Sequence, residues 1–203
     1  MKLALLDKDG TLVISTEENG FINKPEQQII KPGSLDLVKR LLSQDFTLAI
    51  VSNQGGVEKR FKSLDTVFDE MMYCNNLFVK ELDMPVFERI YFCPDFQGNT
   101  CYVGEISGYS THSQSWIGGK PWDLSNTSSA QKLGTKGKFR KPCSGMLEQA
   151  IWYYSRNSVD KNKLEKVIMI GDREEDKQAA ENVEIQFYWI EEAIGMVNIL
   201  PLQ

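Results

Sequence analysis

The sequence has one histidine, four cysteines and only a small excess of acidic over basic side chains. No apolar run approaches the roughly 18 residues that a membrane helix requires. The opening stretch MKLALLDKDG reaches a charged residue at Asp7, too early for the apolar part of a secretory signal. Cysteines in a chain without such a signal are expected to stay reduced. These absences predict a soluble, cytoplasmic protein without a membrane partner.

The charge balance also lacks the basic excess that proteins use to bind a nucleic acid backbone. The chain carries 28 acidic and 23 basic side chains, for a net charge of −5. This weighs against a nucleic acid partner. Its 203 residues, 41% apolar and 25% charged, are typical of a soluble globular protein and suffice for a full core. We therefore predict one domain over 1–203, with a monomer as the favoured state.

Short apolar runs alternate with segments of helical periodicity along the chain. This alternation predicts an α/β fold, a Rossmann-like, mostly parallel sheet with helices on both faces and no large cap domain. In such sheets the functional groups lie beyond the carboxyl ends of the strands. The expected strands are 2–6, 46–51, 89–93, 166–170 and 185–190, and the expected helices are 34–42 with Ser34 as N-cap, 61–82, 144–155 and 175–183.

Residues 98–139 interrupt the alternation. They are rich in glycine and serine and show no sustained period. A long aperiodic connection within a compact domain is usually functional or disordered. We predict a loop insertion that partly folds over the strand ends. Its tryptophans, Trp116 and Trp122, would either stack on a ligand or pack against the edge of the core.

Two carboxylates follow the first predicted strand. Asp7 and Asp9 are two residues apart, so a straight strand would point both the same way. Gly10 permits a sharp turn there, and Thr11 can hydrogen-bond it. Carboxylates held together need a shared proton or a cation, and oxygen ligands favour Mg²⁺. The alternative is a strand-end turn with solvated aspartates.

Four motifs in order resemble the haloacid dehalogenase superfamily. They are Asp7-Lys-Asp9-Gly-Thr-Leu, Ser52-Asn-Gln, Lys141 and Gly171-Asp172-Arg-Glu-Glu-Asp176. The motif sequences Asp-Lys-Asp, Ser-Asn-Gln-Gly-Gly-Val and Arg-Lys-Pro-x-x-Gly-Met are similar to those of the histidinol-phosphate and heptose-bisphosphate phosphatases. The polynucleotide 3′-phosphatases are a neighbouring branch with related second and third motifs. Lys8 and the acidic pI favour the metabolite branch.

The resemblance implies a role for each residue of these motifs. Asp7 would be the nucleophile that forms an aspartyl-phosphate. Asp9 would act as general acid and base, which requires a raised pKa. Mg²⁺ would be held by Asp7, the backbone carbonyl of Asp9 and Asp172. Thr11 and Asp176 would have supporting roles. The implied phosphate or substrate ligands are Ser52, Asn53, Gln54, Arg140, Lys141 and Arg173.

Some of these residues have simpler interpretations. Asp176 could line the helix face of Asp172 or cap the helix. Arg140 and Arg173 could face solvent rather than bind a second phosphate. A structural zinc is not expected, because its possible ligands Cys93, Cys101, His112 and Cys143 have irregular spacings.

The implied function is hydrolysis of a small phosphorylated metabolite, of the sugar bisphosphate or histidinol-phosphate type, by a Mg²⁺-dependent phosphomonoesterase. The partner would then be a small-molecule phosphate ester. Two alternatives are a polynucleotide 3′-phosphatase, which alone would bind nucleic acid, and a phosphate-binding protein without catalysis.

Overall fold

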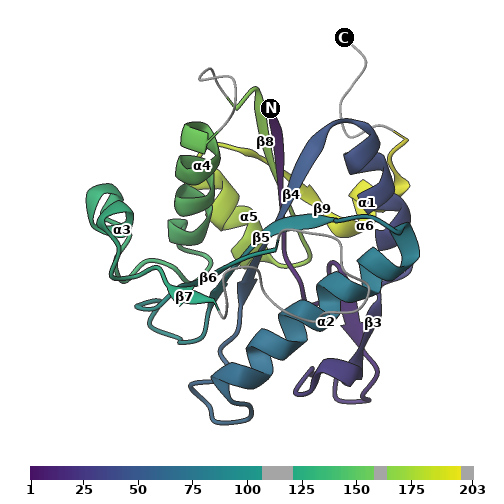
Figure 1. Ribbon diagram of the computed structural model, residues 1–203, viewed down its shortest axis with the longest axis horizontal. Helices are drawn as coiled ribbons and strands as arrows, with labels where there is room; N and C mark the ends of the chain where they lie inside the picture. Colours follow the sequence, from purple (N-terminus) through teal and green to yellow (C-terminus); the bar gives the residue numbers. More distant parts are fainter. Residues whose placement is uncertain (107–120, 158–163, 198–203) are drawn as a thin grey trace.

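The computed structural model describes residues 1–106, 121–157 and 164–197. Its centre is a seven-stranded sheet in the order β7-β6-β5-β4-β1-β8-β9 (Figure 1). Strands β5, β4, β1, β8 and β9, which are neighbours in this order, are parallel. Strands β6 and β7 are antiparallel and form one edge of the sheet. The bounds are β1 Lys2–Leu6, β4 Phe46–Asn53, β5 Phe87–Cys93, β6 Tyr102–Glu105, β7 Trp122–Asp123, β8 Lys166–Gly171 and β9 Gln186–Trp189.

Helices cover both faces of this sheet, and each face has its own apolar cluster. Because side chains alternate along a strand, Ala4 and Leu6 of β1 face one cluster and Leu3 and Leu5 face the other. The first cluster includes α1 (Ser34–Ser43), α2 (Leu64–Leu82) and α6 (Ile190–Gly195), and the second includes α3 (Ser128–Leu133), α4 (Gly145–Asn157) and α5 (Glu174–Glu181). The predicted α/β class and two-faced covering are confirmed.

The predicted elements differ from the observed ones mainly at their ends. The helix expected over 61–82 begins at Leu64, because the Ser63 hydroxyl accepts a hydrogen bond from the backbone N–H of Thr66 at 3.0 Å and caps it. Ser34 was the expected N-cap of α1, but that position belongs to Gly33, whose φ is 86°. Ser34 instead donates its hydroxyl to the Thr11 carbonyl at 2.6 Å. It thereby ties α1 to the turn after β1.

The 98–139 insertion contains regular structure in its described parts. β6 pairs with β5, β7 pairs with β6, and α3 follows. Tyr102 of β6 stacks on Phe92 of β5 with ring centroids 5.5 Å apart. Trp122 lies on β7 beside the Arg89 guanidinium, 5.4 Å from its ring centre. Trp116 lies outside the described residues. The described parts thus add two short strands to the edge of the sheet at β5. Strands this short have no sustained period, so the sequence pattern did not predict them.

A small hairpin follows the turn after β1. It consists of β2 (Val13–Ser15) and β3 (Gln28–Ile30), with a short 3-10 helix η1 at Pro25–Gln27 between them. We call residues 13–30 the β2–β3 segment. Three-residue strands are too short for a recognisable alternation, so the sequence analysis missed them. Nowhere in the described ranges is a helix both long and apolar enough to cross a membrane.

Candidate active site

The carboxyl ends of β1, β4 and β8 meet at a cavity of about 300 Å³. The predicted residues Asp7, Asp9, Ser52 and Lys141 line it, as does the loop of the β2–β3 segment. The turn after β1 brings Asp7 and Asp9 there and is closed by a 2.9 Å bond from the Leu12 N–H to the Lys8 carbonyl. The motifs therefore meet at the carboxyl ends of the parallel strands, where functional groups lie in sheets of this kind.

Lys141 is at the centre of the site. Its ammonium group is 2.7 Å from Asp7 Oδ1 and 2.6 Å from Asp176 Oδ1. It also donates to the Val51 carbonyl at 2.8 Å. Only 2% of the Lys141 side chain is exposed, so these contacts replace its hydration shell. The position before Pro142 is thus a buried cation rather than a loop lysine.

Burial raises the pKa of Asp7 to about 7, although the Lys141 ammonium opposes this shift. The neighbouring carboxylates Asp176 and Asp9 raise the pKa further, because like charges disfavour ionisation. Asp7 is therefore only partly ionised near neutral pH. Additional positive charge at this place would favour the anionic form.

Three carboxylates here could hold a cation. Oxygen atoms of Asp7, Asp172 and Asp176 all lie within 4.8 Å of one another. Hard oxygen donors at this spacing suit Mg²⁺. Thr11 donates its hydroxyl to Asp172 Oδ1 at 3.3 Å, which orients that side chain. Asp176, expected only in a supporting role, is part of the cluster.

Asp176 also caps helix α5, as one of the simpler interpretations suggested. Its Oδ2 accepts a hydrogen bond from the backbone N–H of Arg173 at 3.1 Å. Oδ1 is left for Lys141. The same carboxylate therefore fixes the start of α5 and lines the cluster. Gly171 makes room for it, because a Cβ there would lie 2.4 Å from Asp176 Oδ2.

The turn after β1 leaves no space for a side chain at Gly10. Its φ is +89°, and a Cβ would lie 2.2 Å from Asp172 Oδ2. We expect Gly10→Ala to displace Asp172 and lower Mg²⁺ affinity by about tenfold or more, since one ligand would be lost. Isothermal titration calorimetry measures this. Gly20→Ala has open space at its Cβ and a similar φ of +74°, so it controls for backbone strain. Equal affinity in both variants would contradict the assignment of Asp172.

Asp9 is held by two partners. Gln54 donates its side-chain amide to Asp9 Oδ2 at 2.7 Å, and the Lys8 ammonium lies 2.5 Å from Oδ1. Burial by itself would raise the pKa of Asp9, but Lys8 and the Gln54 hydrogen bond bring it below its usual value. The raised pKa that the resemblance implied is wrong for this state of the protein. The same Gln54 amide donates to the Ser52 hydroxyl at 2.9 Å.

Asn53 lines the cavity and is hydrogen-bonded to the backbone of Lys141. Its amide nitrogen donates to the Lys141 carbonyl at 2.9 Å, and its oxygen accepts from the Lys141 N–H at 3.0 Å. Both ends of the Asn53 amide are thus engaged by the backbone of one residue, Lys141. Asn53 holds the Lys141 loop against β4. Its role as a phosphate ligand stays a prediction.

The rim of the cavity combines cations with phenyl rings. The Arg140 guanidinium lies 4.5 Å from the ring centre of Phe96, and its buried Nη1 has no hydrogen-bond partner among the described residues. Arg173 is 65% exposed and 3.8 Å from Asp172. Phe21 and Phe61 also line the cavity and are largely exposed. Arg140 therefore offers a donor to a bound anion. Arg173 lines the same cavity, and its role as a substrate ligand stays a prediction.

The possible zinc ligands do not form a cluster within the described ranges. Cys93 and Cys101 are buried in the second apolar cluster, whereas Cys143 is exposed. Burial raises the pKa of the Cys93 thiol to about 12, which disfavours the thiolate that zinc requires. His112 lies outside the described residues. The absence of zinc stays a prediction.

A connected group of four polar residues extends from Asp9, and none of them was among the predicted site residues. Lys8, used only to choose a branch, contacts Asp9, Gln28 and Glu70, and Glu70 contacts Lys62. Glu70 is fully buried on α2. Its signal is an acidic residue inside the apolar stripe of that helix, directly before Met71 and Met72. A charge in such a stripe indicates a buried partner.

Comparison with known proteins gives a consistent assignment. A family model described as polynucleotide kinase 3 phosphatase matches residues 2–193. The D-glycero-beta-D-manno-heptose-1,7-bisphosphate 7-phosphatase of Bordetella bronchiseptica is 34% identical over 74 residues, or 35% of this chain and 40% of that relative. The chain thus spans less than half the length of this relative. The corresponding enzyme of Thermosynechococcus vestitus is 26% identical over 180 residues, covering 87% of this chain and 72% of its own.

A solved structure has the same fold. It is the D,D-heptose 1,7-bisphosphate phosphatase of B. bronchiseptica complexed with magnesium and phosphate. The TM-score is 0.62 at 21% identity, and the match covers 99% of this chain and 89% of the other.

Proposed function

Because the chain belongs to the polynucleotide kinase 3 phosphatase family, within the haloacid dehalogenase superfamily and its heptose bisphosphate branch, we propose that it is a Mg²⁺-dependent phosphomonoesterase. The observation that most supports this proposal is the cluster of Asp7, Lys141 and Asp176 next to Asp172. It lies at the carboxyl ends of the parallel strands. It combines a carboxylate, a buried cation and further oxygen ligands around one small cavity. Phosphoryl transfer depends mainly on such positioning and charge stabilisation.

In the proposed reaction Asp7 attacks phosphorus. Lys141 binds Asp7 Oδ1, which leaves Oδ2 as the attacking atom. The P–O bond to the leaving group breaks as the Asp7–P bond forms. Water then attacks phosphorus, releases inorganic phosphate and restores Asp7. The Lys141 ammonium and the Ser52 hydroxyl stabilise the phosphoryl oxygens.

Asp9 moves the protons. It gives one to the leaving oxygen and later takes one from the attacking water. Lys8 and Gln54 hold Asp9 as a carboxylate. A phosphate dianion bound next to it would raise its pKa, because like charge favours the protonated form. Substrate binding therefore prepares Asp9 for its first step.

The residues present fit Mg²⁺. The carboxylates of Asp7 and Asp172 and the backbone carbonyl of Asp9 would hold it, with Asp176 close by. The ion would neutralise charge on the phosphoryl group. The magnesium and phosphate in the B. bronchiseptica structure support this proposal.

Mg²⁺ affinity should depend on pH through Asp7. Its pKa of about 7 means that a proton competes with the metal below pH 7. The apparent affinity should therefore fall as pH is lowered from 7 to 5, by up to about tenfold per unit, and level off above pH 8. Calorimetric titration in buffers of different ionisation enthalpy measures both the affinity and the released proton. An affinity independent of pH over this range would contradict the raised pKa.

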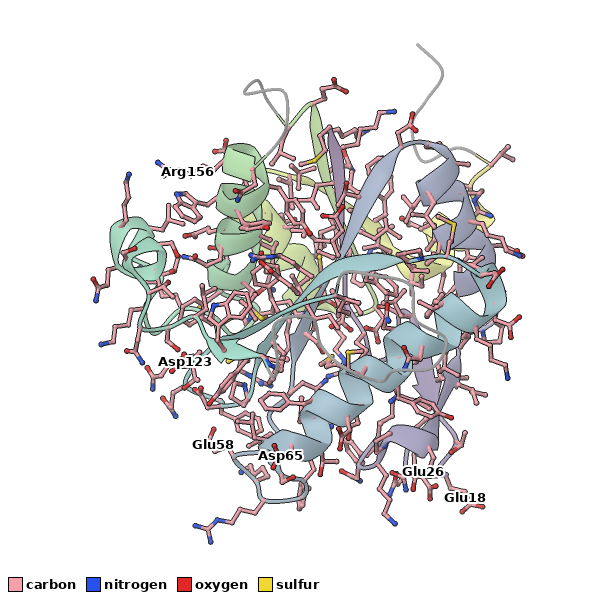
Figure 2. The ribbon with its side chains drawn as sticks, viewed as in Figure 1. Glu18, Glu26, Glu58, Asp65, Asp123 and Arg156 are labelled. Atoms are coloured by element: carbon pink, nitrogen blue, oxygen red, sulfur yellow. The ribbon has the colours of Figure 1, made fainter. Side chains whose placement is uncertain are left out.

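For the substrate, we propose a sugar bisphosphate. The two relatives are named for a heptose bisphosphate. Arg140, with its unpartnered buried Nη1 at the rim, could bind the second phosphate. Figure 2 shows Glu18, Glu26, Glu58 and Asp65 at the edge of the molecule near the β2–β3 segment and the start of α2. Lys24, Lys59 and Arg60 are exposed in the same segments, so the charge of this edge is mixed. The net charge of −5 favours a small ester over a polynucleotide.

A phosphate-release screen tests the proposal. It compares sugar bisphosphates, sugar monophosphates, histidinol phosphate and 3′-phosphorylated oligonucleotides, each with Mg²⁺ and with EDTA. We expect Mg²⁺-dependent release, fastest from a sugar bisphosphate. The family description keeps the oligonucleotide as the second candidate, and its preferred, salt-sensitive hydrolysis would establish that function instead. No release from any ester would contradict both.

A further inference from the structure

A row of charged side chains runs from Asp9 through the buried Lys8 and Glu70 to Lys62. Lys8 is fully buried, with its ammonium 2.5 Å from Asp9 Oδ1 and 3.9 Å from Glu70 Oε2. The same Glu70 oxygen is 2.6 Å from the ammonium of Lys62, whose side chain is 5% exposed. The row alternates in sign and is neutral overall. Each cation therefore has a carboxylate on one side at least.

The row ends at the cavity wall. Lys62 also donates to the Ile22 carbonyl at 2.9 Å. Ile22 belongs to the β2–β3 segment and lines the cavity together with Phe21 and Asn23. The row thus connects the proposed general acid with the segment that closes one side of the site.

Gln28 joins the row from the β2–β3 segment. Its side-chain oxygen accepts from the Lys8 ammonium at 3.3 Å, and its amide donates to the Glu70 backbone carbonyl at 3.0 Å. β3 is therefore attached to α2 at the same place. Glu70 Oε1 has no hydrogen-bond partner among the described residues, so the carboxylate is held by the two lysines alone.

We propose that Glu70 is a positioning residue that fixes Lys8 against Asp9 and Lys62 against the β2–β3 segment. It does not touch the reacting atoms. Without its charge two buried ammonium groups would share Asp9 as their remaining carboxylate neighbour, and Lys8 would lose the partner opposite Asp9. Asp9 would then no longer be aimed at the leaving oxygen. The inference rests on the proposed phosphatase function.

Leaving groups of different quality separate this role from general damage to the fold. An alkyl phosphate needs a proton from Asp9 as its P–O bond breaks, whereas p-nitrophenyl phosphate does not. The parameter kcat/KM reports the steps through phosphoryl transfer to Asp7. Glu70→Gln keeps the shape of the side chain and removes its charge. Glu81→Gln, exposed on the same helix, is the matched control.

We expect Glu70→Gln to lower kcat/KM by about tenfold or more for the alkyl phosphate that the wild-type protein hydrolyses fastest, and by less than about threefold for p-nitrophenyl phosphate. Glu70→Asp, which keeps the charge, should recover much of the alkyl activity. Parallel losses with both substrates, or no loss with either, would overturn the proposal. A wild-type protein inactive on both would contradict the proposed function itself.

If Glu70→Gln does not fold, the double variant Glu70→Gln/Lys62→Gln replaces it. This variant removes one charge of each sign, so the buried row stays neutral. Lys62 lines the cavity, so its loss should lower kcat/KM for both substrates. Lys8 still lacks its second carboxylate, so the ratio of the alkyl kcat/KM to the p-nitrophenyl kcat/KM should again fall below the wild-type ratio. A wild-type ratio of the two kcat/KM values in the double variant would overturn the role of Glu70.

Discussion

Asp7→Asn is expected to lower kcat by about 10⁴-fold or more, because the amide cannot attack phosphorus. The same substitution should stabilise the metal-free protein at pH 8. The pKa of Asp7 is about 7 in the folded protein and 3.8 in a model compound, so folding disfavours the ionised form. This penalty is absent below pH 4, grows up to about pH 7 and stays constant above it. Asparagine removes it.

Initial rates and thermal unfolding with EDTA at pH 4 and pH 8 measure the two effects of Asp7→Asn. Asp69→Asn, an exposed change on α2, is the control and should alter neither. Retained activity in Asp7→Asn would contradict the assigned nucleophile. If Asp7→Asn had a lower melting temperature than the wild-type protein at pH 8, with full secondary structure, burial of the ionised Asp7 carboxylate would not destabilise the fold.

Lys141→Met should reduce both activity and stability. The substitution leaves Asp7 and Asp176 next to each other without the cation between them. Breaking a buried ion pair in this way costs about 3–5 kcal/mol of unfolding free energy. Loss of a buried cation at the transferring phosphoryl group should lower kcat by about 10²–10³-fold. Mg²⁺ should restore part of the stability, because it supplies positive charge to the same carboxylates.

Denaturant unfolding with and without Mg²⁺ and steady-state kinetics measure these effects. Lys80→Met, which removes an exposed lysine from α2, is the matched control. If Lys141→Met kept both its stability and its kcat, the central place of Lys141 would be wrong. A stability loss that Mg²⁺ does not reduce would separate the lysine from the metal cluster.

The central strands could be predicted because they are buried on both faces. β1 and β4 are continuous apolar runs, and each ends at a polar motif. β2 and β3 have three residues each and are held by contacts with the turn after β1 and with α2, so no local pattern marks them. β7 has two residues and depends on β6 in the same way. Pairing across the fold decides these short strands.

The site was predictable in its membership but not in its charges. Motif order brought Asp7, Lys141 and Asp172 together as expected. The pKa of Asp9 could not be foreseen, because it depends on Lys8 turning inward, away from solvent. Glu70 is far from any motif and becomes visible only through the packing of α2. Spacing along the chain reports strand ends, whereas charge state depends on what each side chain meets in space.

A covalent phosphoryl group on Asp7 is the central claim, and chemical trapping tests it most directly. The protein is mixed with Mg²⁺ and its best substrate, stopped during turnover, reduced with borohydride and analysed by peptide mass spectrometry. We expect the aspartyl-phosphate to be reduced to homoserine at position 7, and no such product to form without substrate. Reduction at another carboxylate, or none at position 7 while phosphate is released with inversion at phosphorus, would contradict it.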